Sequence, residues 1–308
     1  MKKKIEISYN DEIRFFFQRL SLFLYHLVVC FVSAIGVYSF ALIFLFASFT
    51  VPSSSMEPTL YTGDYILVLK WWMGARIFNV NHAIQHKAIQ IYRLPGLERL
   101  RRNDIVVFNY PYPDRNDSIG FNLLKYYVKR CVGVPGDSIE IRKTHVYIRN
   151  KKSPSKYSLN QNKLQRTNRN LLSIDKSIPK SESFPNDTLI GWATNESDPL
   201  LIPYNGCHIA LQHKEYILYK TIIEWESKCE FKEVDENVFA LNGTIISSYT
   251  FQKNYYFMLG DNFSSSYDSR DWGLVPEEYI VGIVWGIWKS INKHTGKFRW
   301  NRFMKRVV

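Results

Sequence analysis

The sequence lacks the residue groupings that many hydrolases use. It contains no C-x-x-C and no H-E-x-x-H motif, so a zinc site has no support, and no other metal or cofactor is indicated. It also contains no G-x-S-x-G elbow, and none of its seven histidines lies near the serine tract at residues 53–55. A Ser-His-Asp triad is defined by geometry and is not excluded, but nothing in the sequence indicates one.

Cysteine is also scarce, with only four in 308 residues, which excludes a disulfide scaffold. Cys30 lies in a long apolar run, and Cys131 lies in a predicted strand. Cys207 and Cys229 fall in one region of the chain. Either a disulfide between them or two separate thiols fits the sequence.

Charge is nearly absent between Leu20 and Met56, where only His26 could carry one. This run exceeds the roughly 20 residues that cross a bilayer, and a cleavable signal peptide has an apolar region of only about 7 to 15. We therefore predict a transmembrane helix or signal anchor at residues 20–50. An additional span that begins near Arg14 is an alternative, although Arg14 and Arg19 argue against it.

The residues before this helix predict its orientation. Segment 1–19 carries five basic residues against three acidic ones, and basic residues beside a first span stay in the cytoplasm. We therefore expect residues 1–19 to be cytoplasmic and everything after residue 50 to lie outside. The basic residues are Lys2, Lys3, Lys4, Arg14 and Arg19.

The formal net charge of +12 fits anionic lipid or nucleic acid until its location is known. Residues 289–308 carry seven Lys or Arg and no acid, with Trp300 and Phe303 among them. On an extracytoplasmic chain, this mixture favours an anionic lipid surface over nucleic acid. A solvated tail fits equally well.

The remaining pattern predicts a mainly β protein, and the 20 Tyr, 20 Phe and 8 Trp agree with this. Apolar and β-branched runs predict strands within 63–72, 104–111 and 126–150, and a strand, a polar loop and a second strand within 254–290. Segment 214–229 resembles a helix, and short strands flank residues 242–251. Segment 71–103 interrupts the strand pattern, and the polar segment 151–200 reads as a surface insertion.

One strand offers a base for the serine tract. A buried lysine can replace histidine, because desolvation favours the neutral amine. In "YYVKRCVGV" the side chains of Tyr127, Lys129 and Cys131 share one face of the strand, and Arg130 lies on the other, where it can form an ion pair. The alternative is two exposed basic residues at a strand edge.

Four segments resemble, in order, the successive motifs of the bacterial type I signal peptidases, which are membrane-anchored Ser/Lys endopeptidases. The segments are "PSSSMEPTL", "NDIVVFNYP", "YYVKRCVGVPGD" and "GDNFSSSYDSRDWGLVP". The resemblance covers residues 20–140 and 254–300. It implies an antiparallel β catalytic domain at 51–150 and 240–308, with a variable α+β cap insertion at 151–239.

The resemblance also implies catalytic roles. Ser55, directly before the methionine, corresponds to the nucleophile, and Lys129 corresponds to the general base. Ser53 corresponds to a serine whose hydroxyl joins the Ser55 backbone N–H in the oxyanion hole, where such a donor is worth roughly 3 to 4 kcal/mol. Ser54 stands where many members have glycine, and it acts as a spacer.

Further positions correspond to residues that orient or support the dyad. The resemblance implies that Ser266 orients the lysine amine and that Asp268 and Arg270 form an ion pair that holds the loop. The other supporting positions are Asp261, Asn262, Tyr127 and Arg130. Segment 263–265 departs from the family's Arg-Asp-Asn, so any role of those three positions is in doubt.

The implied function is the removal of signal peptides from exported preproteins, with small residues at the first and third positions before the cut. The expected partners are these preproteins and membrane lipid, without nucleic acid, at the outer face of the bacterial plasma membrane. Ser55 follows the predicted span by about six residues, which places it at the depth where a membrane-held substrate exposes its cleavage site.

Three other functions remain open. Pilin-maturation peptidases and self-cleaving repressors also use Ser/Lys dyads, but the apolar span disfavours a repressor. A catalytically inactive binding protein is disfavoured because Ser55, Lys129 and Ser266 are all present. A basic envelope protein could instead act through the tail at residues 297–308.

Overall fold

The computed structural model describes the chain except for residues 1, 86, 88, 114–117, 143–144, 151–152, 159–182, 186, 188–189, 191, 294 and 308, and except for the side chains of 2–13, 150 and 153–158. The chain divides into two compact units, Met1–Phe46 and Ala47–Val308. Most of the predicted insertion at 151–200 therefore lies outside the described residues.

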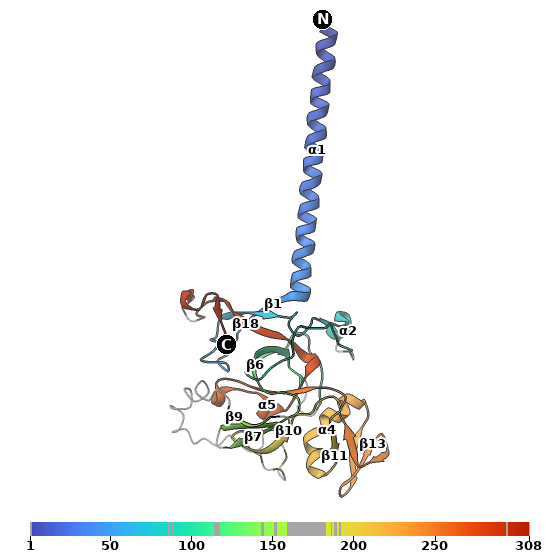
Figure 1. The fold of residues 1–308 in the computed structure, drawn as a ribbon, viewed down its shortest axis with the longest axis vertical. Helices are drawn as coiled ribbons and strands as arrows, with labels where there is room; N and C mark the ends of the chain where they lie inside the picture. The colour runs from blue at the N-terminus through green and yellow to red at the C-terminus, as the bar shows by residue number, and fades with distance from the viewer. Residues whose placement is uncertain are drawn as a thin grey trace. The chain divides into compact units, whose positions relative to one another are not determined.

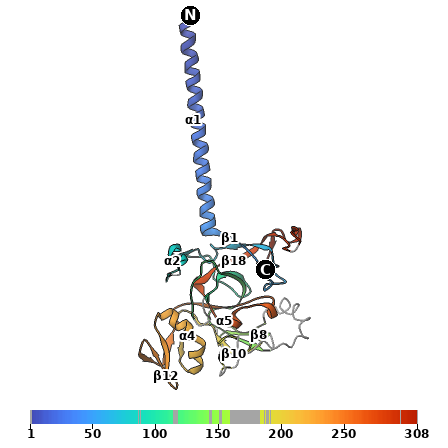
Figure 2. The same cartoon turned by 180° about the vertical axis from the view of Figure 1, so that it is seen from behind.

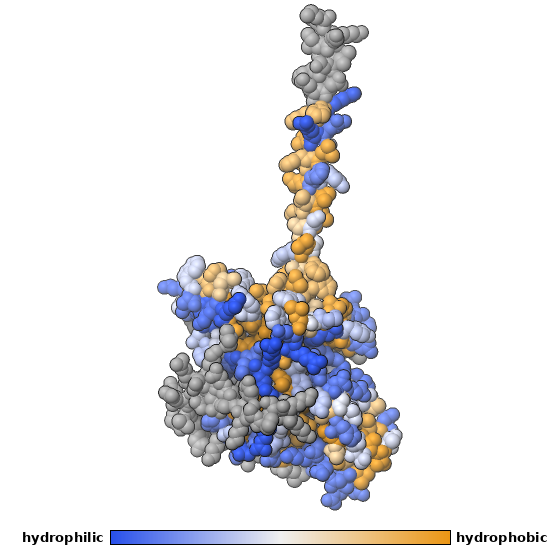
Figure 3. All heavy atoms as spheres, viewed as in Figure 1, coloured by the Kyte–Doolittle hydropathy of each residue, from blue (hydrophilic) through white to orange (hydrophobic). Residues whose placement is uncertain are grey.

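The first unit is helical. Helix α1 (Lys2–Phe40) continues into a π-helical turn, η1 (Ala41–Leu45). Within the described residues, Arg14–Leu45 is the one helix that is long and apolar enough to cross a membrane. Figure 3 shows mostly apolar side chains along much of its described length.

The predicted helix at 20–50 is wrong at its end, because Phe46–Thr50 forms strand β1. Two influences favour the strand. Phe and Thr have high strand propensity, and β1 pairs with β2 (Asp64–Leu69) in the main sheet.

The main sheet of the second unit has the order β1-β2-β18-β5-β6-β16-β17, and β19 pairs with β18. From β2 to β17, and between β18 and β19, the paired strands run antiparallel, as predicted. The remaining strands are β5 (Ile105–Asn109), β6 (Tyr126–Gly133), β16 (Tyr255–Leu259), β17 (Val275–Pro276), β18 (Ile280–Ser290) and β19 (Lys305–Arg306). The predicted strands within 63–72, 104–111, 126–150 and 254–290 are thereby confirmed.

Three smaller sheets and a helix form the cap. A four-stranded sheet has the order β10-β7-β8-β9, and two others join β11 to β15 and β12 to β13 and β14. Figure 1 shows α4 beside β11 and β13, and Figure 2 shows α4 beside β12. The bounds are β7 (Asp137–Arg142), β8 (His145–Asn150), β9 (Ser153–Ser158), β10 (Glu196–Leu201), β11 (His208–Ala210), α4 (His213–Ser227), β12 (Phe231–Asp235), β13 (Val238–Leu241), β14 (Thr244–Ile246) and β15 (Ser248–Thr250).

The predicted domain boundaries do not coincide with gaps between sheets. Residue 150 is the last residue of β8, which pairs with β9, and residue 240 falls inside β13. The described residues of segment 71–103 form short elements only: β3 (Arg76–Ile77) pairs with β4 (Tyr92–Arg93), and α2 is Val80–Ile84. In the described residues, no disulfide joins Cys207 to Cys229.

Besides the pairing of β19 with β18, a buried ion pair ties the basic tail to the sheet. Arg302, in the short helix η5 (Trp300–Arg302), is only 6% exposed and donates to Asp64 at 2.5 Å from Nη2 and to Thr59 O at 2.9 Å. Asp64 is fully buried and also accepts from Ser290 Oγ at 2.6 Å. The tail is therefore not a wholly solvated segment, although Trp300 is 76% exposed.

We expect Arg302→Met to lower the free energy of unfolding by about 3 kcal/mol, because it leaves the buried Asp64 carboxylate without its main cation. Chemical denaturation in detergent, followed by tryptophan fluorescence, measures this change. The matched control is Lys305→Met, whose exposed side chain should change stability by less than about 0.5 kcal/mol. Equal midpoints for the two variants would show that the ion pair contributes nothing.

Candidate active site

The serine tract lies in the connection between β1 and β2. Two apolar anchors, Met56 and Leu60, are 1% and 0% exposed and pack in a core with Val51. Leu60 N donates to Met56 O at 2.9 Å, which makes a single tight turn directly after Ser55. Burial of these anchors fixes the backbone on which Ser55 stands.

Lys129 lies in the middle of β6 and reaches this turn. Its Nζ is 2.8 Å from Ser55 Oγ and 3.0 Å from Ser266 Oγ, and the residue is 4% exposed. These three residues are far apart in sequence, and the sheet brings them together. The amine thus contacts a potential nucleophile and a second hydroxyl while it is shielded from water.

Burial lowers the pKa of Lys129 from 10.5 to about 8. The Asp268 carboxylate raises this pKa again, and the Arg270 guanidinium lowers it. A pKa of about 8 leaves roughly a tenth of the amines neutral at pH 7, against fewer than about one in a thousand for an ordinary lysine. The geometry therefore supplies a base that works near neutral pH.

The loop after β16 supplies the second hydroxyl and supports the nucleophile. Asn262 N donates to Ser55 O at 3.0 Å, and Asn262 Nδ2 donates to Ser54 O at 3.3 Å. Gly260 allows this close approach, because a Cβ there would lie 2.1 Å from Ser266 Oγ and 2.5 Å from Ser55 O. Only glycine fits between the two serines.

The Asp268–Arg270 ion pair holds the same loop from inside. Arg270 Nε and Nη2 donate to the Asp268 carboxylate at 2.8 and 2.9 Å, and Gly260 N donates to it at 3.0 Å. Burial alone would raise the pKa of Asp268, but the Arg270 guanidinium holds it below its usual value. Arg270 also donates to Phe263 O at 2.7 Å, so the pair spans the turn that contains Ser266.

Asp271 is a neighbour of the site that the sequence reasoning missed. It accepts from Asp268 N at 2.7 Å, and together the two carboxylates form a capping box at the start of α5 (Ser269–Trp272). Burial, reinforced by the charge of Asp268, raises the pKa of Asp271 to about 6. The signal was the spacing Asp-x-x-Asp, which is typical of a helix start.

Arg130 forms an ion pair, as expected from its position beside Lys129. Its Nε and Nη2 donate to Asp261 at 2.7 and 2.6 Å, and both residues are buried. The same guanidinium donates to Asn103 O at 2.7 Å. The pair ties β6 to the loop that carries Asn262 and Ser266.

Tyr127 and Ser53 complete the predicted set. The Tyr127 ring stacks on Tyr110 with centroids 4.6 Å apart, and Lys129 Nζ lies 6.0 Å from the Tyr127 centroid. Ser53 Oγ is 3.4 Å from Ser55 Oγ. The structure therefore places Ser55 and Ser266 on the Lys129 amine and Ser53 beside Ser55, while the other predicted residues lie on β6 or in the segment that follows β16.

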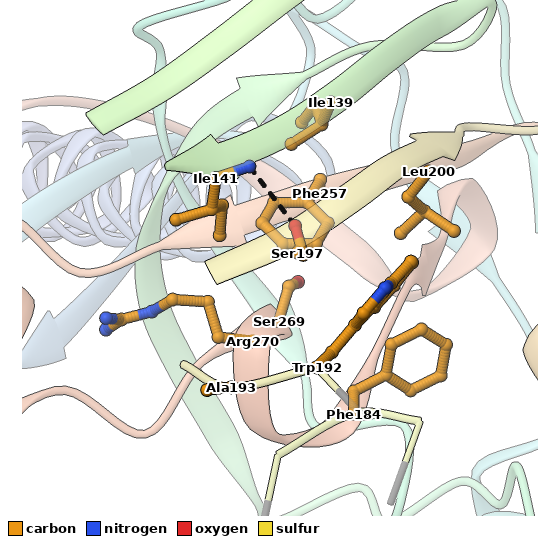
Figure 4. A pocket seen from close by; sticks show the side chains of 10 residues that line it. All are labelled: Ile139, Ile141, Phe184, Trp192, Ala193, Ser197, Leu200, Phe257, Ser269 and Arg270. Carbon is orange, nitrogen blue, oxygen red and sulfur yellow. Dashed lines mark hydrogen bonds between the residues drawn. The ribbon is translucent and has the colours of Figure 1, made fainter. Parts of the chain in front are cut away.

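The cap touches the segment that follows β16 and carries Ser266 and Arg270. Phe184 N donates to Arg270 O at 2.7 Å, and Ser269 and Arg270 line a small cavity of about 20 Å³. Figure 4 shows the Phe184 and Trp192 rings on the opposite side of this cavity from the Arg270 side chain. Sequence reasoning gave the insertion no role, since contacts between segments this far apart leave no local pattern.

In the part of the chain that the structure describes, no three His, Cys, Asp or Glu side chains gather closely enough to hold a metal ion. The polar groups at the site are hydroxyls, one amine, the Asp261 and Asp268 carboxylates that are paired with arginines, and the Asp271 carboxylate in the capping box. This set can perform nucleophilic and acid–base chemistry.

A family model described as signal peptidase, peptidase S26, matches residues 24–288. The chain belongs to the signal peptidase family. Among its relatives, the signal peptidase I of Buchnera aphidicola subsp. Schizaphis graminum is 32% identical over 286 residues, 86% of this chain and 74% of the relative. The signal peptidase I of Haemophilus influenzae is 26% identical over 289 residues, 86% of this chain and 70% of the relative.

Membership in the signal peptidase family makes the chain a serine endopeptidase and confirms the resemblance. The apolar helix Arg14–Leu45 fits a membrane anchor. A solved signal peptidase I from Enterococcus faecalis V583 is 21% identical, with 60% of this chain and 97% of that chain covered and a TM-score of 0.30.

We expect Gly260→Ala to lower kcat at least about a hundredfold, because the added methyl would displace Ser266 Oγ and the Ser55 backbone, and displacements near 1 Å have costs of that size. Steady-state cleavage of a peptide substrate measures it. The control is Gly36→Ala, where a Cβ meets nothing within 4 Å. Unchanged kcat in Gly260→Ala would mean that the close approach of Gly260 to Ser55 and Ser266 is not needed for activity.

Lys129→Met should stabilise the fold. Below pH 8 both the native and the unfolded chain carry a protonated Lys129, and the native chain bears the desolvation cost, about 3 kcal/mol for a pKa lowered from 10.5 to about 8. Between pH 8 and 10.5 only the unfolded chain binds the proton, so wild-type stability rises with pH.

We therefore expect the free energy of unfolding of Lys129→Met to exceed that of the wild type by up to about 3 kcal/mol at pH 7. This difference should shrink above pH 8. Chemical denaturation at several pH values measures this difference. A variant that is less stable than the wild type at every pH would contradict the desolvation account.

Proposed function

We propose that this chain removes signal peptides from exported preproteins, with Ser55 as nucleophile and Lys129 as general base. The observation that carries the proposal is the 2.8 Å contact between Lys129 Nζ and Ser55 Oγ at a buried amine with a pKa of about 8. Relatives named signal peptidase I in several bacteria support the substrate class.

The first step is acylation. Neutral Lys129 takes the proton from Ser55 Oγ as the oxygen attacks the scissile carbonyl, which becomes a tetrahedral oxyanion. The lysine ammonium then protonates the leaving amine as the C–N bond breaks, and an acyl-enzyme on Ser55 remains. Ser266 Oγ, 3.0 Å from Nζ, keeps the amine directed at Ser55 throughout.

The oxyanion needs donors that are already in place. The Ser55 backbone N–H and the Ser53 hydroxyl fill this role, and Ser53 Oγ lies 3.4 Å from the nucleophilic oxygen. The Asn262 bonds to the carbonyls of Ser54 and Ser55 fix the peptide planes beside that N–H. In the second step, neutral Lys129 activates a water that hydrolyses the ester and restores Ser55.

The resemblance to the signal peptidases also predicts which residues the substrate carries around the cleavage site. We expect small residues at the first and third positions before the cut and a substrate held in the membrane by its own apolar segment. The N-terminus would be cytoplasmic and the catalytic domain extracytoplasmic, at the plasma membrane, in line with the basic residues before the apolar helix. Exposed Trp300, Phe303 and Met304 beside basic residues suit contact with lipid.

The test is cleavage of a preprotein in detergent by the wild type, Ser55→Ala and Lys129→Ala. Both variants should lose at least about a thousandfold in kcat, because each removes a member of the dyad. The control is Ser54→Ala, which removes a hydroxyl from the spacer and should retain most activity. Circular dichroism checks that all variants are folded.

The pH–rate profile gives a second readout of the same proposal. Activity should rise through an apparent pKa near 8, because deprotonation of Lys129 creates the base. A limb near 10, or full activity in Lys129→Ala, would exclude the buried amine as the base. An active Ser55→Ala would exclude the nucleophile.

A further inference from the structure

A groove of about 630 Å³ opens at the end of β16 that is remote from the dyad. Val134 and Gly136, directly after β6, form one wall, and Asn254 and Tyr256, at the start of β16, form another. Gly260 and the dyad lie beyond the opposite end of β16. The volume is within the range of about 300–1,000 Å³ that is usual for organic ligands.

One arginine of a basic run faces this groove without a carboxylate partner. Arg101 pairs with Glu98 at 2.9 Å, and Arg102 pairs with the buried Asp137 at 2.5 Å. Arg99 lines the groove, is exposed, and forms no ion pair with any residue in the described part of the chain. Of the three arginines, the one at the groove has its charge available to a ligand.

A buried hydroxyl adds a second polar group at the groove. Tyr256 is 2% exposed and lines the groove, and within the described residues its hydroxyl has no hydrogen-bond partner. Its oxygen is also not fully sealed from solvent, since the sealed side-chain polar atoms without a partner in the described residues belong to Trp192, Glu215 and Trp272. It therefore opens onto the groove.

Arg99 and Tyr256 both line the groove, and other charged groups lie near Tyr256. Burial raises the pKa of Tyr256, and the Glu277 carboxylate adds to this, while the Arg93 and Arg99 guanidiniums oppose it. Glu277 accepts from Asn254 Nδ2 at 2.6 Å, and Arg93 donates to three backbone carbonyls. Arg99 is thus the cation near Tyr256 that is not already engaged.

The rest of the lining suits an organic chain better than a bare anion. Leu100 and Leu201 give the groove apolar contacts, and the Tyr204 ring, 45% exposed, stands beside Gly136. The Asn205 side chain adds an amide that can pair with peptide groups. Arginine binds carboxylates with two parallel hydrogen bonds, so a carboxylate fits the charged end.

We propose that this groove binds a peptide segment bearing a carboxylate side chain, which Arg99 and the Tyr256 hydroxyl recognise while Tyr204 flanks the chain. The site is separate from the dyad and does not depend on the proposed reaction. The groove gives the domain a contact with acidic polypeptides that is separate from the dyad.

The experiment uses the full chain in detergent with Ser55→Ala, so that no probe can be cleaved. Fluorescence anisotropy compares a short labelled peptide of alternating Glu and Gly with its Gln and Gly counterpart. The Glu peptide should bind about tenfold more tightly, which is the size of one charge-assisted hydrogen bond. Arg99→Gln should remove this preference, and Tyr256→Phe should weaken binding of the Glu peptide about threefold.

The matched control is Arg101→Gln, which removes the same charge from the same run but outside the groove, and it should keep the tenfold preference. Equal weakening by Arg99→Gln and Arg101→Gln would overturn the proposal, because diffuse positive charge would then explain binding. Displacement of the Glu peptide by inorganic phosphate at the concentration at which unlabelled peptide displaces it would also overturn the proposal, since the groove would then be a simple anion site.

Discussion

The Lys129 amine is shielded from most water and contacts two hydroxyls instead. The cost of this desolvation constrains the residues that surround the amine. The desolvation costs about 3 kcal/mol at neutral pH, which is a large share of the stability of an ordinary domain. Packing must offset it, and the rings near β6 provide that packing. Tyr127 stacks on Tyr110, and Phe108 and Tyr110 both pack against Trp272.

Charge balance around the amine is as important as burial. An unpaired Asp268 would hold Lys129 in its protonated form, but Arg270 neutralises that carboxylate at 2.8 Å. Arg130 and Asp261 form a second closed pair on the other side of β6. Asp261 and Asp268 are thus each matched by a guanidinium, and the amine remains free to lose its proton.

Local pattern and resemblance predicted much of this molecule. Apolar and β-branched runs located the central strands, and the motifs around Ser55, Lys129 and Ser266 brought together residues that the fold places in contact. The prediction failed where the deciding contact is distant in sequence. Pairing with β2 turned residues 46–50 into a strand, and the Asp64–Arg302 bond joins segments that share no local pattern.

The place of β18 in the sheet has a consequence for the order of assembly. This strand, Ile280–Ser290, lies between β2 and β5 and bonds to both, although those strands precede it by well over a hundred residues. The two halves of the sheet cannot join until residue 290 has been synthesised. While the chain is being synthesised, Ser55 and Lys129 therefore remain on two parts of the sheet that have not yet joined, and the contact between them forms only after nearly all of the chain is available.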